Sequence, residues 1–338
     1  MTNPVLVELT RGPLVESIHR GSFAIADADG RLVASIGDVK SPVYSRSSLK
    51  PIQALPLVES GAAEAFGLSD EEVALACASH SAEPMHTDRV AKWLERIGCT
   101  VDDLACGAHP IRDEAIAADM VRKGLKPTRL HNNCSGKHTG FLTVARHWDI
   151  ATAGYEKHDH PVQKAVAAAL ADLIGMNDDF PWGIDGCAAP NFAVPLDAFA
   201  MAMARMASPD KLPPQRTAAA KRIVRAMTKY PELVAGTGRA CTILMRAMDG
   251  VAVKTGAEGF FIAIIPSRGL GVALKIDDGA GRASECVMAA ILERLGLLGN
   301  SEAAHAYARG PLRNTRGEIV GEMRSAGALE SIKWNALA

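Results

Sequence analysis

A serine and a lysine three positions apart, Ser47 and Lys50, are the first residues in this sequence whose types and spacing suggest chemistry. On a helix, this spacing places a hydroxyl and an amine on the same face. A serine hydroxyl is a weak nucleophile until a neighbouring base accepts its proton, and an uncharged lysine amine is such a base. The pair therefore suggests nucleophilic catalysis, although the same spacing occurs by chance in many proteins.

A second motif, Lys254-Thr255-Gly256, lies on a predicted strand near the end of the chain. A Ser-x-x-Lys motif followed later by Lys-Thr-Gly is typical of serine β-lactamases and penicillin-binding proteins. A lysine on such a strand supplies positive charge for a substrate carboxylate and helps to keep the first lysine uncharged. Ser79-His80-Ser81 stands where that class has Ser-x-Asn, but it lacks the asparagine. The alternative interpretation of Lys-Thr-Gly is a simple hairpin end.

Two polar segments each carry a cysteine. Cys134 lies in His131-Asn132-Asn133-Cys134-Ser135-Gly136-Lys137-His138, before a predicted helix, and Cys187 lies in a Gly/Pro-rich loop, 183–190, predicted between helices. Loops with such side chains bury little apolar surface and need hydrogen-bond partners. The two thiolates could share a zinc ion, with a nitrogen ligand or water completing a tetrahedron. The alternative is two buried thiols in ordinary turns.

The composition narrows the class of partner. The 338 residues carry a net charge of −1, and only 5% of them are aromatic, which argues against nucleic acid or a membrane surface. The start of the chain lacks a basic segment followed by an apolar one, and no apolar run is long enough to span a membrane. Seven widely spaced cysteines are not typical of a disulfide scaffold. We expect a cytoplasmic protein that handles a small molecule.

Strand-like patterns occur at both ends of the chain, and helical periodicity fills the middle. The predicted strands are 5–9, 22–26, 32–36, 242–246, 251–254, 259–265, 270–276 and 318–323. The predicted helices are 49–60, 70–78, 86–97, 112–123, 138–147, 161–174, 196–206, 213–229 and 284–295. We predict an α+β fold with an antiparallel sheet built from both termini, about 5–37 and 240–323, and a largely helical middle, about 47–230. The whole chain, 1–338, is predicted to be a single catalytic domain.

Five segments together resemble the asparaginase II family, the rhizobial-type or class 3 L-asparaginases. They are Ser-Arg-Ser-Ser-Leu-Lys-Pro, Ala-Ser-His-Ser, the octapeptide that contains Cys134, Asp-Gly-Cys-Ala-Ala-Pro and Lys-Thr-Gly-Ala-Glu-Gly. The resemblance runs from about Val5 to about Met323. It implies a fold similar to that of serine β-lactamases, a homodimer, a zinc cofactor, and hydrolysis of L-asparagine to L-aspartate and ammonia.

The resemblance also implies roles for individual residues. Ser47 would be the nucleophile and Lys50 its base, while Ser79 and Lys254 would form a second Ser–Lys pair. A zinc ion would be bound by three further residues, Cys134, Lys137 and Cys187. An amine is an unusual ligand because it must first lose a proton, which a metal ion and a helix start favour.

Four residues near these motifs are candidates for substrate binding. By the resemblance, His138 and Asp185 would orient the substrate or support the metal ligands. Arg46 could bind the α-carboxylate of asparagine, with a plain surface charge as the alternative. His80 could contact the substrate or only cap a helix end. Another polar run, Lys157 to His160, is expected to lead into the helix that begins at Pro161, and it could help to close the site.

These motifs predict an L-asparagine amidohydrolase that works through a serine acyl-enzyme beside a zinc ion. A β-lactamase-like or peptidase-like serine hydrolase is one alternative, and it is disfavoured by the expected cytoplasmic location. A catalytically idle, zinc-dependent amino-acid-binding module is another. Asparagine and glutamine both stay open as substrates, because the depth of the pocket decides between them.

Overall fold

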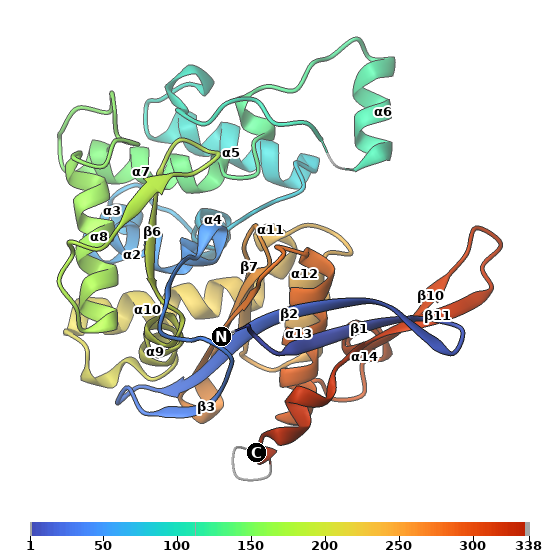
Figure 1. Cartoon of the computed structure of the whole chain (residues 1–338). Coiled ribbons are helices and arrows are strands. Elements are labelled where there is room, and N and C mark those ends of the chain that lie inside the picture. The colour runs from blue at the N-terminus through green and yellow to red at the C-terminus, as the bar shows by residue number, and fades with distance from the viewer. Residues whose placement is uncertain (1, 112, 335–338) are drawn as a thin grey trace. The chain divides into compact units, whose positions relative to one another are not determined.

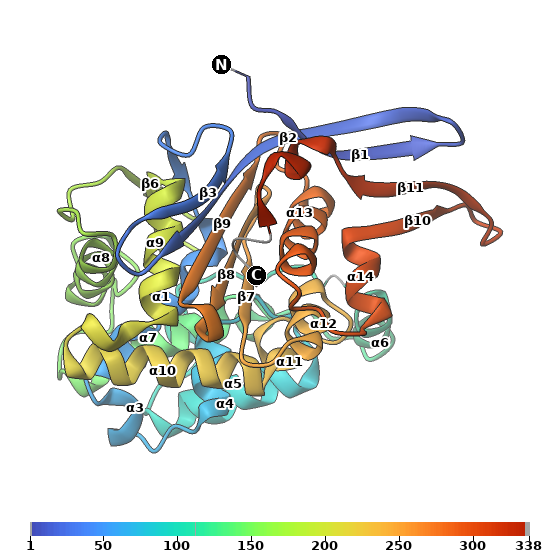
Figure 2. The ribbon, with the colours of Figure 1, turned by 90° about the horizontal axis from the view of Figure 1, so that it is seen from below.

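Strands from both ends of the chain form one antiparallel sheet, as predicted (Figures 1 and 2). The computed structural model describes residues 2–111 and 113–334. Within these residues the sheet has eight strands in the order β10-β11-β1-β2-β9-β8-β7, with β3 paired to β2. The strands are β1 (Val5–Arg11), β2 (Leu14–Asp27), β3 (Leu32–Ile36), β7 (Ala252–Thr255), β8 (Phe260–Ile265), β9 (Leu270–Ile276), β10 (Arg309–Arg313) and β11 (Ile319–Ser325).

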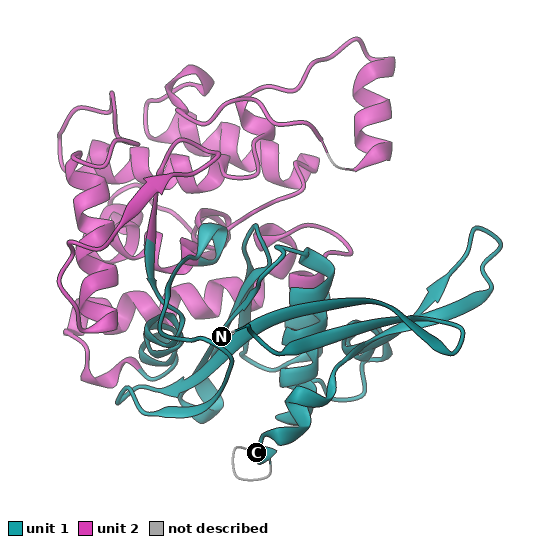
Figure 3. Cartoon of the chain, viewed as in Figure 1, with its two compact units in different colours: residues 1–48, 193–208, 243–338 teal, residues 49–192, 209–242 magenta. Residues whose placement is uncertain are grey.

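The chain divides into two compact units (Figure 3). Unit 1 consists of residues 1–48, 193–208 and 243–338, and it contains the sheet. Unit 2 consists of residues 49–192 and 209–242, and it is mostly helical. This division follows the predicted split into a sheet and a helical part, except that residues 193–208 belong with the sheet. A single catalytic domain stays a prediction.

The core of unit 1 lies on both faces of the central strands. Every residue of β8 is buried, which requires cover on both faces. Helix α9 (Leu196–Ala207) and helix α13 (Gly281–Arg294) provide it from opposite sides (Figure 2). Helix α9 packs directly on the backbone of β9, because a Cβ at Gly271 would lie 2.2 Å from the Ala200 oxygen. Unit 1 also contains β4 (Pro42–Tyr44), which pairs with the second half of β6 (Pro190–Pro195), and helix α14 (Glu302–Ala308).

Unit 2 is built around helix α7 (Ser135–His147), which is buried on all sides from Ser135 to Ala145. A helix without a polar face must be surrounded by other elements. A Cβ at Gly136 would lie 2.4 Å from the Leu75 oxygen, so α7 contacts the backbone of α4 directly. The helices of unit 2 are α1 (Lys50–Gln53), α2 (Leu55–Glu59), α3 (Ala62–Ala65), α4 (Asp70–Ala76), α5 (Pro84–Arg96), α6 (Glu114–Arg122), α7, α8 (Pro161–Ile174), α10 (Pro214–Lys229) and α11 (Pro231–Val234).

Most predicted elements are confirmed within a few residues, and the helix predicted at 70–78 begins with a capping box formed by Ser69 and Glu72. The helix predicted at 49–60 is preceded by a 3-10 turn, Arg46–Leu49, which contains Ser47, and it begins as α1 at Lys50. Position 112, where one helix was predicted to begin, lies outside the described residues. Other 3-10 turns are Val101–Asp103, Arg129–His131, Pro209–Lys211, Pro266–Arg268 and Gly327–Ser331.

Two predictions are wrong. Residues 242–246 were predicted as a strand but lie in helix α12 (Ala240–Ala247). Thr242 and Ile243 suggested a strand, but the buried residues Cys241, Leu244, Met245 and Met248 follow the helical period. The 183–190 loop lies between two short strands, β5 (Trp182–Ile184) and β6, and not between helices. No helix among the described residues is long and apolar enough to cross a bilayer.

Candidate active site

The two serine-hydrolase motifs meet within unit 1. The Ser48 hydroxyl donates a hydrogen bond of 2.8 Å to the backbone oxygen of Lys254 on β7. Two residues after Lys254, a Cβ at Gly256 would lie 2.6 Å from the backbone oxygen of Ser45. Any residue other than glycine would therefore force the backbone to move at this position. The segment that carries Ser47 is therefore held against the end of the Lys-Thr-Gly strand, as the order of the motifs predicts.

The backbone immediately before Ser47 is strained. Arg46 has a φ of +49°, in the left-handed region that non-glycine residues rarely adopt. Strain of this kind costs about 1–3 kcal/mol and clusters at functional sites. Ser47 is half-buried, whereas the Ser48 side chain is buried and bonded to β7. Arg46 forms an ion pair of 3.9 Å with Glu258, so its guanidinium has a protein partner in addition to any substrate.

Lys50, in unit 2, has three neighbours that sequence spacing alone would not place together. Its amine donates to the backbone oxygen of Ala78, lies 3.0 Å from the Ser79 hydroxyl, and lies 3.1 Å from the Cys134 sulfur. The side chain is only 1% exposed. The backbone N–H of Ser79 donates to Val234 at 2.9 Å, which holds this segment against the end of α11. Lys50, the predicted base, therefore contacts both the predicted second serine, Ser79, and a predicted metal ligand, Cys134, in one buried cluster.

Cys134 and Cys187 lie side by side, both buried, although 53 positions separate them in the sequence. The Cys134 thiol donates a hydrogen bond of 3.2 Å to the side-chain oxygen of Asn133, and the close approach of the two sulfurs raises the pKa of Cys134 and lowers that of Cys187. The Lys137 amine also donates to Cys187, at 3.0 Å. Burial opposes the charge on Lys137, but the two sulfurs outweigh burial and raise its pKa. The three predicted metal ligands are thus adjacent.

The remaining residues of the two cysteine segments support this cluster. The loop that carries Cys187 turns tightly, since Ala188 has a φ of +74° and its N–H bonds to the Asp185 oxygen at 2.9 Å. A carboxylate oxygen of Asp185 lies 3.8 Å from the Cys187 sulfur. His138 is fully buried, and its Nδ1 lies 2.7 Å from the Tyr155 hydroxyl. Tyr155 carried no signal in the sequence, because a tyrosine in a polar loop is not part of any motif.

His80 is held by the protein through both of its ring nitrogens. The N–H of Ala82 donates to Nδ1 at 3.1 Å, so Nε2 carries the hydrogen and donates to Ser135 at 2.9 Å. Burial, together with the nearby His86 and Lys50, lowers the pKa of His80 well below its ordinary value. These contacts favour the interpretation of His80 as a residue that joins the end of α4 to the start of α7. Neither nitrogen is left for a substrate without breaking one of the two bonds.

Burial of His80 predicts a pH-dependent stability. The lowered pKa means that the unfolded chain binds a proton below about pH 6.5 while the native state does not. Stability is therefore fully present above that pH and is lost as the pH falls, by about 1.4 kcal/mol per pH unit for this one group. Urea denaturation at pH 7.5 and pH 5.5 checks this, and His80→Gln should show a smaller difference between the two pH values. An equal or larger difference in the variant would contradict the prediction.

Cys134, Lys137 and Cys187 would offer a zinc ion two sulfur ligands and one nitrogen ligand. Among residues 2–111 and 113–334, no group of three or more His, Cys, Asp or Glu side chains is placed to hold a metal ion. The predicted set contains only two such residues, and its third ligand is an amine. Two thiolates and a nitrogen are ligands that zinc accepts. The residues present therefore fit a zinc ion on the condition that Lys137 acts as a ligand in its uncharged form.

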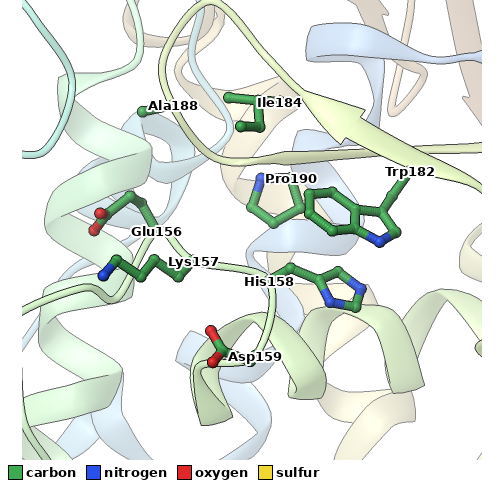
Figure 4. Close-up of a pocket in the computed structure, with 8 residues that line it drawn as sticks. All are labelled: Glu156, Lys157, His158, Asp159, Trp182, Ile184, Ala188 and Pro190. Carbon is green, nitrogen blue, oxygen red and sulfur yellow. The ribbon is translucent and has the colours of Figure 1, made fainter.

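A pocket of about 460 Å³ is lined by residues of the loop before α8 and by residues on both sides of Cys187 in sequence, all within unit 2 (Figure 4). Ile184 and Ala188, which line it, flank the loop residues Asp185 to Cys187. The rings of His158 and Trp182 stack in its wall with centroids 4.3 Å apart.

The predicted lead-in to α8 is confirmed, because the side chain of His160 caps that helix by accepting a hydrogen bond from the N–H of Val162. Whether residues 157–160 close over a substrate stays a prediction.

The other five cysteines are buried thiols. All seven cysteines lie in the described part of the chain, buried and not joined by disulfides. Burial raises the pKa of Cys106 to about 12, which leaves its thiol protonated and unreactive.

Several solved structures are similar to this one at low sequence identity. A β-lactamase from Mycobacterium bovis is 14% identical with a TM-score of 0.46, over 81% of this chain and 94% of the other. Mglu in its native form is 14% identical with a TM-score of 0.48, over 82% of this chain and 64% of the other. A variant of simvastatin synthase from Aspergillus terreus is 11% identical with a TM-score of 0.39, over 85% and 93% of the two chains. The α+β class itself is confirmed by the strands and helices described above.

The amino-acid sequence identifies the family of this chain, which the structural similarities do not. No curated protein sequence matches the chain significantly. The family model described as L-asparaginase II matches residues 7–325, a span that contains every motif discussed above. The chain therefore belongs to the L-asparaginase II family, a family of hydrolases that act on amides.

Proposed function

We propose that this protein hydrolyses the side-chain amide of L-asparagine to L-aspartate and ammonia through a serine acyl-enzyme. The observation that carries the proposal is the buried contact of Lys50 with Ser79 and Cys134, in a chain of the L-asparaginase II family. Among the described residues the Lys50 amine contacts a hydroxyl, a sulfur and a backbone oxygen but forms no ion pair with a carboxylate, which suits it to accept and return a proton. Ser47 is three residues away along the chain, within roughly 11 Å even if fully extended.

In the proposed mechanism, Ser47 attacks the amide carbon while its proton passes to the amine of Lys50, which acts as the general base. The tetrahedral oxyanion is stabilised by backbone N–H groups at the start of the Ser47 turn. The carbon–nitrogen bond then breaks, and the leaving nitrogen takes the proton as ammonia departs. Water attacks the aspartyl ester in the same way, which releases aspartate and restores the Ser47 hydroxyl.

Ser79 and Lys254 are proposed as the second Ser–Lys pair. The contact of Ser79 with the Lys50 amine supports this role, because a proton can pass between these two groups without solvent. Lys254 is 1% exposed and lies on the strand that holds the Ser47 segment. Arg46 and Asp185 are proposed to bind the charged α-carboxylate and α-amino groups of the substrate.

Zinc is proposed as the cofactor, bound by Cys134, Lys137 and Cys187. When bound, the ion would supply positive charge close to the substrate. Lys137 is paired with the Cys187 sulfur in the structure described here, so it has to release a proton before it can donate a lone pair. A homodimer is proposed on the family resemblance alone, and a cytoplasmic location is proposed on the cysteine content, since the cysteines are not joined by disulfides in the described part of the chain.

The zinc assignment predicts a measurable metal content. Protein prepared without chelators should contain close to one zinc per chain, and Cys187→Ala should contain less than a tenth of that amount. Cys286→Ala is the matched control, because Cys286 is an equally buried thiol in α13 of unit 1 and is not one of the proposed ligands. Because all three ligands must lose protons, zinc affinity should also fall as the pH is lowered. Full activity of the wild-type protein without bound zinc would contradict the proposal that zinc is its cofactor.

The close packing of the Ser47 segment against Gly256 predicts that replacing this glycine will strongly lower kcat. Gly256→Ala should lower kcat at least tenfold, because its methyl carbon would lie 2.6 Å from the Ser45 oxygen and 3.0 Å from the Ser48 hydroxyl. A backbone contact cannot be relieved by a side-chain rotation, so the Ser47 segment has to move, and a shift of about 1 Å can cost about 10²-fold. Gly281→Ala, with no atom within 4 Å of the new carbon, should behave like wild type. Equal rates for both variants would contradict the argument.

The function itself is tested by ammonia release from asparagine and glutamine measured side by side. We expect turnover of asparagine, and a preference over glutamine of about 10–200-fold if the pocket is shaped against one methylene. Nitrocefin hydrolysis without ammonia release would replace the proposal with a β-lactamase. Asparagine binding without any turnover would replace it with an amino-acid-binding module.

A further inference from the structure

We infer that Glu258 sets the substrate class of this site: its carboxylate binds the α-ammonium group of an amino-acid amide, while the guanidinium of Arg46 binds the α-carboxylate. This role deepens the proposed function and rests on it, because it describes how the same site selects its substrate. Asp185, proposed above for the α-amino group, keeps that role, because an ammonium group has three hydrogens to donate. The segments that carry the pair, 45–48 and 256–279, both belong to unit 1.

Glu258 lies in the turn between β7 and β8, directly after the Lys-Thr-Gly motif. Two residues before it, Gly256 packs on the backbone of the segment that carries Ser47, since a Cβ at Gly256 would lie 2.6 Å from the Ser45 oxygen. Arg46 is the residue between Ser45 and Ser47. The ion pair of 3.9 Å between Arg46 and Glu258 therefore joins the two segments right beside the proposed nucleophile.

Both residues of the pair have a left-handed backbone. The angle φ is +49° at Arg46 and +57° at Glu258, in a region that residues with a side chain rarely adopt. The Glu258 carboxylate also lies against the turn that follows β9, because a Cβ at Gly279 would be 2.7 Å from one of its oxygens. The backbone of the turn and this close contact together fix the direction of the Glu258 side chain.

A gain in stability does not explain this arrangement. The ion pair joins atoms 3.9 Å apart, which is beyond the range of a hydrogen bond, and the Glu258 side chain is 67% exposed. An exposed ion pair of this kind returns less free energy than two left-handed residues cost. Backbone strain of this kind clusters at ligand-binding sites. The strained, solvent-facing pair next to Ser47 therefore points to a ligand that carries charge.

Two opposite charges side by side match the two charges of an α-amino acid. Asparagine carries its ammonium and its carboxylate on one carbon, and its amide carbon is two bonds further along. A guanidinium donates to a carboxylate, and a carboxylate accepts from an ammonium group. An amide without the ammonium group gains nothing from Glu258, so it should be a poor substrate. Glutamine has the same two charges, so this pair selects α-amino acids and does not separate asparagine from glutamine.

The test compares L-asparagine with succinamate, which has the same carboxylate and the same amide but no ammonium group. Ammonia release is measured for the full-length wild type and for Glu258→Gln, a substitution that keeps the shape of the side chain and removes its charge. Glu258→Gln should lower kcat/KM for asparagine by about 10–100-fold, mainly through KM, as expected for one hydrogen bond to a charged group. It should not lower kcat/KM for succinamate. An equal loss for both substrates, or no loss for asparagine, would overturn the inference.

Glu16→Gln is the control, because Glu16 also forms an exposed ion pair in unit 1, with Arg11 at 2.8 Å, and it should match wild type on both substrates.

Calorimetric binding of L-aspartate and of succinate separates this role of Glu258 from the proposed function, because these two ligands also differ only in the ammonium group. Wild type should bind L-aspartate more tightly than succinate, and Glu258→Gln should lose this preference. If the preference is present but no ammonia is released from asparagine, the proposed hydrolase is refuted and the role of Glu258 stands. Wild type without any preference for L-aspartate would overturn the inference, and this comparison decides alone if Glu258→Gln does not fold.

Discussion

Replacing Ser47 by alanine should lower kcat for asparagine hydrolysis by roughly 10⁴–10⁶-fold, the range seen when a serine hydrolase loses its nucleophile. The covalent step is then lost, and the rest of the site can still bind substrate, so KM should change far less than kcat. Mass spectrometry of wild type quenched during turnover should show an aspartyl adduct on the peptide that contains Ser47. Neither the adduct nor the activity should be present in Ser47→Ala.

The neighbouring serine, Ser48, provides a matched control for this prediction. Ser48 is equally a hydroxyl next to the same turn, but it is buried and its hydrogen is donated to the Lys254 oxygen. Ser48→Ala should therefore cost about 1 kcal/mol of stability, the worth of an ordinary hydrogen bond. Its kcat should stay within about tenfold of wild type, as expected for a residue that only helps to hold the segment. Near-normal turnover in Ser47→Ala, or an adduct on Ser48, would show that the nucleophile is misassigned.

Replacing Lys50 by methionine should lower kcat by about 10²–10⁴-fold, the usual contribution of a general base. Methionine has a similar length and fills the buried space, but it cannot accept the Ser47 proton. The Ala78 oxygen and the Ser79 hydroxyl also lose a contact with the amine, which should reduce stability by about 1–3 kcal/mol. Lys40→Met is the control, because Lys40 is exposed and ion-paired to Asp197 on the surface of unit 1. It should be close to wild type.

Two further variants separate a base from a fixed charge at this position. Lys50→Arg keeps a cation but removes a usable base, since a guanidinium does not lose its proton in proteins. It should be as inactive as Lys50→Met, and activity near that of wild type would rule out the proposed role. If Ser47 and Lys50 act as one unit, the double variant Ser47→Ala/Lys50→Met should be no slower than Ser47→Ala alone. Additive losses would mean that the two residues act in separate steps.

Local patterns predicted most elements of the fold, because periodicity and capping act within a few residues. The Ser69 cap, the α8 range and the β9 range were all readable in this way. The failure at 242–246 has a physical cause. Thr242 and Ile243 have strand-like propensities, but the buried residues of α12 recur every three to four positions, and burial outweighs propensity.

The sequence by itself determined which side chains are available for chemistry: the Ser-x-x-Lys and Lys-Thr-Gly motifs and the two cysteine segments. Tertiary structure decided which of them meet. The contacts of Lys50 with Ser79 and Cys134, and of Lys137 with Cys187, join positions 29, 84 and 50 residues apart. Such distances depend on how α7 packs in unit 2, and no local pattern encodes them. The same holds for the contact between Tyr155 and His138 and for the hydrogen bonds that hold the ring of His80.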